Sequence, residues 1–238
     1  QLLIGPAERA DVIVDFSKFK AGDTIYLLNV GPDEPFGGPF PANVLADANT
    51  TGQVMQFSVI PLNAPDTSVI PALPTVTPVG TPTNVRQVSL NELDSAQVCV
   101  DRNNVYTNPV SFNPLVCATR SAPLGPLEAE LGTVNPDGTG NPLEFMAAIT
   151  ENPAIGATEE WEIHNFTADA HPIHVHQVMF QVVSRQVMGG AVRGPESWES
   201  GYKDTVISYP GEITRIKAVY DIPGLFVWHC HILSHEDN

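Results

Sequence analysis

The sequence predicts an all-β protein folded as a sandwich of two sheets, and three observations support this. Short segments rich in β-branched and aromatic residues recur along the chain, as in the strands of antiparallel sheets. Turn-forming residues separate them, with 18 glycines and 22 prolines among 238 residues. No segment keeps the 3.6-residue periodicity of a long amphipathic helix. Many short strands bounded by turns are typical of a β-sandwich.

The strand candidates fall into two groups. The first lies near the N-terminus, at residues 11–16, 24–30 and 54–60, with a glycine- and proline-rich loop over 31–41. The second comprises residues 86–90, 144–149, 159–165, 178–187, 205–209, 212–220 and 225–231. Residues 123–142 are rich in glycine, proline and asparagine, so we expect a surface loop there.

A proline-rich segment separates the two groups. Residues 61–83 contain six prolines among threonine, valine and alanine. Proline favours an extended backbone, and the segment lacks the alternation of a strand. We therefore expect three parts: residues 1–60 as part of one domain, 61–83 as a linker, and 84–238 as a second domain.

The chain is strongly acidic, with a formal net charge of −16. This charge opposes binding to phosphate backbones and anionic lipid, so we expect no nucleic-acid partner. No apolar run reaches 18 residues, so we expect no membrane-spanning helix. Such a chain suits a secreted, periplasmic or cell-surface protein. Cys99 and Cys117 form either a disulfide, which would indicate an oxidising compartment, or two buried thiols, and the sequence leaves both open.

Two short motifs near the C-terminus hold six of the seven histidines, His171-Pro-Ile-His174-Val-His176 and His229-Cys230-His231-Ile-Leu-Ser-His235. The second also contains the remaining cysteine. Chance clustering of such uncommon residues is improbable, and a shared metal site explains it. The seventh histidine, His164, alternates with Trp161 and Ile163, so we expect it on the solvent face of a strand.

Strand geometry divides these ligands into two sets. Residues i and i+2 share a face of a strand, so His229 and His231 point one way and Cys230 points the other. His174 and His176 likewise share a face. His171 lies across a proline turn, and a turn or short helix after His231 can return His235 toward Cys230. The first set is then Cys230, His171 and His235, and the second is His174, His176, His229 and His231.

The ligand chemistry favours copper. One thiolate with two imidazoles is the ligand set of a blue-copper electron-transfer site. Zinc sites often take thiolates from a Cys-x₂₋₄-Cys pair, and the sequence has no such pair. An all-imidazole cluster suits copper, iron or zinc, but beside a His₂Cys set it indicates copper at both places.

At these residues the chain resembles the C-terminal part of the multicopper oxidases, the family of laccases, bilirubin oxidases and spore-coat laccases. Both histidine motifs match those of the family's last domain, and Gly5-Pro-Ala-Glu-Arg-Ala-Asp-Val-Ile-Val-Asp-Phe16 looks like its second domain. The resemblance implies cupredoxin-like Greek-key domains, with residues 1–60 ending domain 2 and residues 84–238 forming domain 3. The matched positions are His171, Cys230 and His235 for type 1 copper, His174 for type 2, and His176, His229 and His231 for type 3.

The resemblance also implies the reaction and the partners. A small-molecule donor gives single electrons at Cys230, and these pass through His229 or His231 to a trinuclear copper cluster that reduces O₂ to water. Residues 1–163 contain no histidine, so two further His-x-His pairs are expected from an N-terminal segment of the same oxidase. The axial type 1 ligand would fall at position 240, beyond Asn238. We expect Glu236 to supply protons to the cluster, and Asp169 to orient a ligand histidine.

Two alternatives stay open at this stage. A blue-copper electron carrier would use only the Cys230 set and would leave the other imidazoles unexplained. A relative of copper nitrite reductases lacks a histidine directly after the type 1 cysteine, so His231 counts against it. The reducing substrate is also open, since phenols, bilirubin and metal ions are all oxidised within the family.

Overall fold

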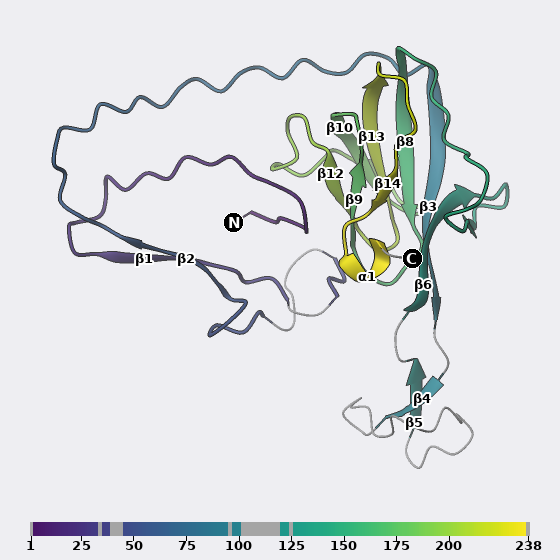
Figure 1. Ribbon diagram of the computed structural model, residues 1–238, viewed down its shortest axis with the longest axis horizontal. Coiled ribbons are helices and arrows are strands. Elements are labelled where there is room, and N and C mark those ends of the chain that lie inside the picture. Colours follow the sequence, from purple (N-terminus) through teal and green to yellow (C-terminus); the bar gives the residue numbers. More distant parts are fainter. Residues whose placement is uncertain are drawn as a thin grey trace.

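The computed structural model describes residues 2–32, 35–38, 45–94, 97–100, 120–123 and 126–236. Within these ranges nearly all of the regular secondary structure is strand, and the C-terminal part of the protein is a sandwich of two sheets (Figure 1). The expected all-β class is confirmed.

The larger sheet of the sandwich has seven strands in the order β11-β10-β13-β8-β3-β6-β7. In chain order these strands are β3 (Asn84–Asp94), β6 (Pro126–Val134), β7 (Gly140–Pro142), β8 (Ala157–Asn165), β10 (Phe180–Val187), β11 (Val192–Arg193) and β13 (Glu212–Tyr220). β3 runs parallel to β8, and the other neighbours are antiparallel. This mixed order places β3, the first strand of the sandwich, in the middle of the sheet.

The smaller sheet has three strands in the order β12-β9-β14. They are β9 (His171–Val175), β12 (Thr205–Ser208) and β14 (Trp228–Cys230), and the short helix α1 (Leu233–Glu236) follows β14 (Figure 1). Both histidine motifs therefore lie on adjacent strands of one small sheet.

The core fills the space between the two sheets. Its fully or almost fully buried residues come from both, and include Val88, Ile163, Phe180 and Ile216 of the larger sheet and Ile173 and Val206 of the smaller one. Burying one such side chain stabilises the fold by about 1.5–3 kcal/mol. Cys230 belongs to the same cluster, with 6% of its surface exposed. The packing of the two sheets thus fixes the cysteine that the sequence singled out.

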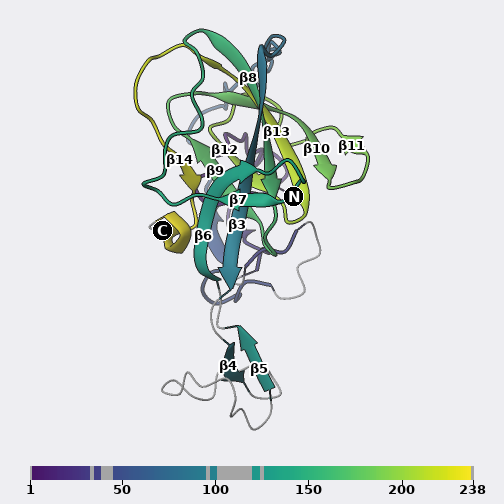
Figure 2. The same cartoon turned by 90° about the vertical axis from the view of Figure 1, so that its right-hand side faces the viewer.

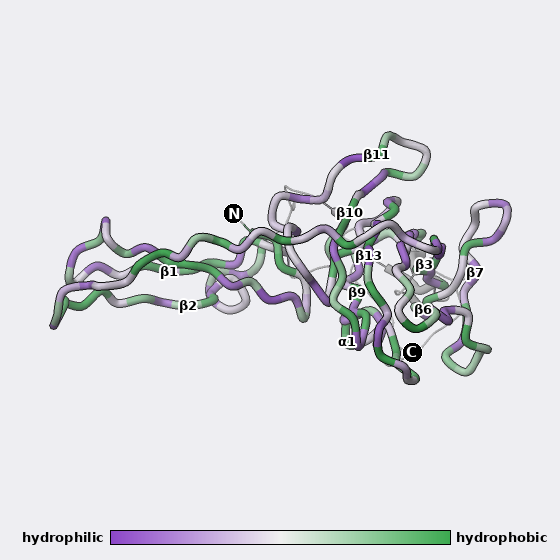
Figure 3. The backbone as a smooth tube through the Cα atoms, turned by 90° about the horizontal axis from the view of Figure 1, so that it is seen from above, coloured by the Kyte–Doolittle hydropathy of each residue, from purple (hydrophilic) through white to green (hydrophobic). Residues whose placement is uncertain are grey.

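Two small sheets of two strands each lie outside the sandwich. β1 (Thr24–Leu28) pairs with β2 (Gln53–Ser58), and this arm extends away from the sandwich with many apolar residues at its surface (Figure 3). An extended, mostly exposed stretch over 61–83 joins it to β3. β4 (Gln97–Val100) pairs with β5 (Arg120–Pro123) beyond the ends of β3 and β6 (Figure 2). The proposed domain boundaries stay a prediction.

Several local predictions are wrong. The expected loop over 123–142 contains β6 and β7, and β6 pairs with β3 along most of its length. The expected strand over 144–149 is a turn, closed by a hydrogen bond from Ala147 N to Glu144 O (2.8 Å). Residues 11–16 form no strand. His164 is buried, with 8% exposed, because its ring stacks on Phe166 and Glu162 lies alongside it.

The side chain of Cys99 and the whole of Cys117 lie outside the described residues. Whether they form a disulfide or two buried thiols therefore stays a prediction. Within the described ranges, no helix has the length and apolar character needed to cross a membrane.

Candidate metal centre

The two histidine motifs meet because β9 and β14 pair antiparallel. His229 lies directly opposite His174, and Cys230 opposite Ile173. Hydrogen bonds from His176 N to Val227 O (3.1 Å) and from His231 N to Pro172 O (2.7 Å) extend the pairing. Trp228 anchors the strand, since its ring packs edge-on against Trp161 in the larger sheet at a centroid distance of 5.6 Å.

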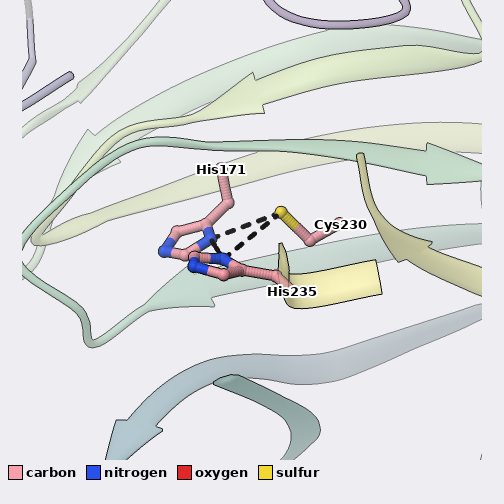
Figure 4. Close-up of side chains that lie close together, drawn as sticks. All are labelled: His171, Cys230 and His235. Atoms are coloured by element: carbon pink, nitrogen blue, oxygen red, sulfur yellow. Dashed lines mark hydrogen bonds between the residues drawn. The ribbon is translucent and has the colours of Figure 1, made fainter. Parts of the chain in front are cut away.

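His171, Cys230 and His235 converge on one point from three elements (Figure 4). Cys230 Sγ lies 3.4 Å from His171 Nδ1 and 3.9 Å from His235 Nδ1, and the two Nδ1 atoms are 3.3 Å apart. A triangle with these sides has its corners about 2 Å from a common point, close to a metal–imidazole bond length. The three donor atoms therefore fit one ion, and the donor set is that of blue copper.

Helix α1 brings His235 back to the cysteine. The backbone N–H groups of His235 and Glu236 both donate to Ile232 O at 2.9 Å, which turns the chain sharply after β14. His235 thereby approaches Cys230 although it lies on the far side of His231 in the sequence. The expected turn is observed.

The other ring nitrogen of His171 is held by oxygen atoms. His171 Nε2 lies 2.7 Å from Thr167 Oγ1, 3.3 Å from Asp169 Oδ1 and 3.5 Å from Glu92 Oε1. Burial lowers the pKa of His171, but hydrogen bonds to Asp169 and Cys230 outweigh it and raise the pKa to about 9. A carboxylate at Nε2 orients the ring and leaves Nδ1 for a metal. Asp169 thus occupies the orienting position expected of it, whereas sequence reasoning missed Thr167 and Glu92.

The second set gathers four imidazoles on the opposite face of β14. Ring centroids lie 4.6 Å apart for His174 and His176, 5.4 Å for His174 and His229, and 4.9 Å for His229 and His231. His176 Nε2 lies 3.1 Å from His229 Nε2. Burial lowers the pKa of His174, which favours the neutral ring that binds metals. The four side chains form the predicted imidazole cluster.

Glu236 lies at the edge of the imidazole cluster. Its Oε2 is 3.2 Å from His231 Nδ1 and 3.7 Å from His229 Nδ1. A cavity of about 400 Å³ beside it is lined by histidines of both sets and by apolar side chains, among them Leu131 and Phe145. The carboxylate of Glu236 therefore contacts the imidazole cluster and lines the cavity.

Two further residues orient His174. His174 Nδ1 lies 2.8 Å from the backbone oxygen of Asp204 and 3.1 Å from Thr205 Oγ1. Sequence reasoning gave neither residue this role, since only the pairing of β9 with β12 brings them to the ring.

Comparison with known proteins decides the family. A family model described as "Multicopper oxidase" matches residues 122–238. A laccase from Bacillus stratosphericus is 32% identical over 98% of this chain and 40% of its own length, and a bilirubin oxidase from Albifimbria verrucaria is 32% identical over 100% and 34%. The chain belongs to the multicopper oxidase family.

A solved multicopper oxidase has a similar fold. The 2F4 variant of McoA from Aquifex aeolicus superposes on 94% of this multicopper oxidase chain and 41% of its own, with a TM-score of 0.56 and 26% identity. The cupredoxin-like fold is thereby confirmed. The chain spans about two fifths or less of the length of each of these relatives. The family binds copper, which agrees with both donor sets, and the roles of individual residues stay predictions.

Proposed function

We propose that this chain is the C-terminal part of a laccase-like multicopper oxidase. The observation that supports it most is the placement of two donor sets on opposite faces of the tripeptide His229-Cys230-His231. Copper bound at these sets supplies one-electron chemistry, in which four single-electron oxidations of a donor are coupled to O₂ + 4 H⁺ + 4 e⁻ → 2 H₂O. His171, Cys230 and His235 hold the type 1 ion, and His174, His176, His229 and His231 hold their share of the trinuclear cluster.

The tripeptide supplies a covalent connection between the two sets. Cys230 is bonded through the backbone to both His229 and His231. In addition, His229 Nδ1 lies 3.1 Å from the backbone oxygen of Cys230, which offers a second, hydrogen-bonded connection between the cysteine residue and the imidazole of His229. A carrier that uses only the Cys230 set needs neither feature.

Glu236 is the residue we assign to proton transfer. Its carboxylate contacts His231 and lines the same cavity as His176 and His229. Reduction of oxygen consumes protons, and a carboxylate within reach of the cluster supplies them in the transition state. The same contact orients the His231 ring.

A second segment of the oxidase, carrying two His-x-His pairs, is proposed to complete the trinuclear site. The cluster has four imidazoles on this chain, and His176 is exposed. Phe145, which lines the same cavity as His176, is 81% exposed, and the next residue, Met146, is 86% exposed. Large exposed apolar side chains grouped together mark interaction surfaces. The reducing substrate is proposed to be a small molecule such as a phenol, bilirubin or a metal ion, and bilirubin is named in one of the relatives. The secreted, periplasmic or cell-surface location stays a prediction.

Copper loading tests the proposed function. The full chain, loaded with Cu(II), should hold at least one copper at Cys230 with the intense thiolate-to-copper absorption of a blue site, and bind more copper at the cluster. Joined to the missing segment, it should bind about four coppers and consume O₂ with a phenolic donor. A chain that takes up a single blue copper and never more, with or without that segment, would instead be an electron carrier.

A further inference from the structure

The segment near the N-terminus is seated on the small sheet that carries the histidines. Residues 5–8 form a tight turn, with hydrogen bonds from Glu8 N to Gly5 O (3.1 Å) and from Gly5 N to Glu8 Oε2 (2.8 Å). Ala7 adopts a left-handed φ of 62°, which is unusual for a residue with a side chain. Gly5 packs so closely that an added Cβ would lie 2.9 Å from Ile207 Cγ1. The turn is thus held in one position against β12.

Two ion pairs join this turn to the residues just before β12. Arg9 binds the Asp204 carboxylate with both terminal nitrogens, at 2.8 and 2.7 Å. Lys203 Nζ lies 2.8 Å from Glu8 Oε1. A bidentate arginine–carboxylate pair fixes the orientation of both groups as well as their distance. We call these four residues the clasp.

One of the two pairs continues to a ligand histidine. The Thr205 hydroxyl donates to Asp204 Oδ1 (3.2 Å), the same oxygen that Arg9 holds. A hydroxyl has one proton, so Thr205 Oγ1 faces His174 Nδ1 as an acceptor. The backbone oxygen of Asp204, 2.8 Å from the same nitrogen, also accepts only. Nδ1 must then hold the ring proton, and the Nε2 lone pair is left for the cluster.

We propose that Arg9 is a positioning residue for His174, acting through the Asp204 carboxylate and the Thr205 hydroxyl to hold the imidazole in its metal-binding orientation. Since His174 is a copper ligand only if the proposed function is right, the inference rests on that proposal. The inference gives Arg9, which lies 195 positions before Asp204 in the sequence, a part in the geometry of the imidazole cluster. Groups that hold the second nitrogen of a metal-bound histidine typically change metal affinity about 10- to 100-fold when removed.

The clasp offers a matched control. Arg9→Gln breaks the pair that leads to His174, whereas Lys203→Gln breaks the neighbouring pair with Glu8. Both substitutions weaken the same docking, and only the first removes support from the chain of hydrogen bonds. Thr205→Val, similar in shape, removes the hydroxyl and leaves both ion pairs.

Two measurements on the full chain separate the outcomes. The first is the ¹⁵N spectrum of the His174 ring nitrogens in the metal-free chain, which reports the tautomer. The second is the affinity of the imidazole cluster for Cu(II), titrated in a Cys230→Ser background to silence the other site. We expect Arg9→Gln and Thr205→Val to shift the ¹⁵N signals of the His174 ring and to weaken Cu(II) binding about 10-fold, because the ring loses support for its orientation. The proton should stay on Nδ1, since the backbone oxygen of Asp204 remains its acceptor. Lys203→Gln should leave both unchanged.

Equal effects of Arg9→Gln and Lys203→Gln, or an unaltered His174 spectrum in Arg9→Gln, would overturn the positioning role. Failure of the proposed function looks different. In that case the parent chain binds no Cu(II) at the cluster, while the ring spectra of the variants still decide whether Arg9 controls the orientation of His174.

Discussion

The two donor sets lie back to back on one strand, and they differ in how completely this chain encloses them. The Cys230 set is mostly buried, with Cys230 and His171 at 6% and 3% exposure, and its three donor atoms already fit one ion. The imidazole cluster is open, with His176 exposed beside a cavity. Strand alternation puts Cys230 on one face and His229 on the other, since neighbouring residues of β14 point to opposite faces.

The difference indicates which site can form without help. The sandwich core orders Cys230 and His171 as it folds, so the three donors of the Cys230 set are held by this chain. The imidazole cluster is more accessible, since His176 is exposed, and we propose that a second segment supplies its remaining ligands. We therefore expect copper at the Cys230 set to be held more tightly than copper at the cluster of the isolated chain.

Cys230→Ser gives the largest expected effect. Without the thiolate the blue absorption should vanish and turnover of the assembled oxidase should fall to background, because electrons no longer enter at this set. The fold should survive, since the substitution buries one small hydroxyl at a cost of about 1–3 kcal/mol. Absorption spectra, oxygen consumption and circular dichroism provide the three readings. A variant that oxidises phenols at the parent rate would refute the assigned route.

His176→Ala should affect the imidazole cluster and leave the Cys230 set unchanged. The blue absorption and its reduction by a donor should persist, while oxygen consumption of the assembled oxidase falls by more than about 100-fold because the cluster loses a ligand. Stopped-flow reduction under anaerobic conditions, compared with steady-state oxygen consumption, separates the two steps. Simultaneous loss of the blue signal would show that the two sets are not independent.

Glu236→Gln keeps the shape and removes the titratable group. Oxygen consumption should fall about 100-fold, within the range for loss of one acid–base group, and its dependence on pH should change. Anaerobic reduction of the blue site should be unchanged. If the pH profile of the variant matches that of the parent, Glu236 acts only to orient His231.

Asp169→Asn should produce the smallest change. The ring of His171 keeps its contact with Thr167 but loses a charged partner, so copper affinity at the Cys230 set should fall about 10-fold. Competition with a copper chelator, monitored at the blue absorption, measures this. Asp204→Asn offers a comparison, because it weakens the side-chain contacts with Arg9 and Thr205 that support the imidazole cluster and should leave the blue site intact.

The donor sets were predictable because their geometry is local. The i, i+2 spacing of His229 and His231 determines that they share a face. His235 follows His231 by four positions, which allows one tight turn between them. The groups that orient the ligands were mostly not predictable. Thr205 reaches His174 through the pairing of β12 with β9, and Glu92 reaches His171 from the opposite sheet. No local pattern in the sequence reports such contacts.

The errors in the fold have physical causes of the same kind. β6 is rich in glutamate and contains Gly132, both unfavourable in strands, yet pairing with β3 outweighs propensity. The glycine is required there, since a side chain would collide with the backbone of Asn141 in β7. Residues 144–149 have the apolar character of a strand, but Phe145 and Met146 are exposed in a turn beside the cavity. An apolar run can serve an interface instead of a core.

Diffraction at the copper absorption edge, from crystals of the copper-loaded chain, tests the central claim most directly. We expect one anomalous peak between His171, Cys230 and His235, and at least one more on the opposite face of β14 among the imidazoles. A peak on one face only would contradict the claim that the His229-Cys230-His231 tripeptide serves two copper sites.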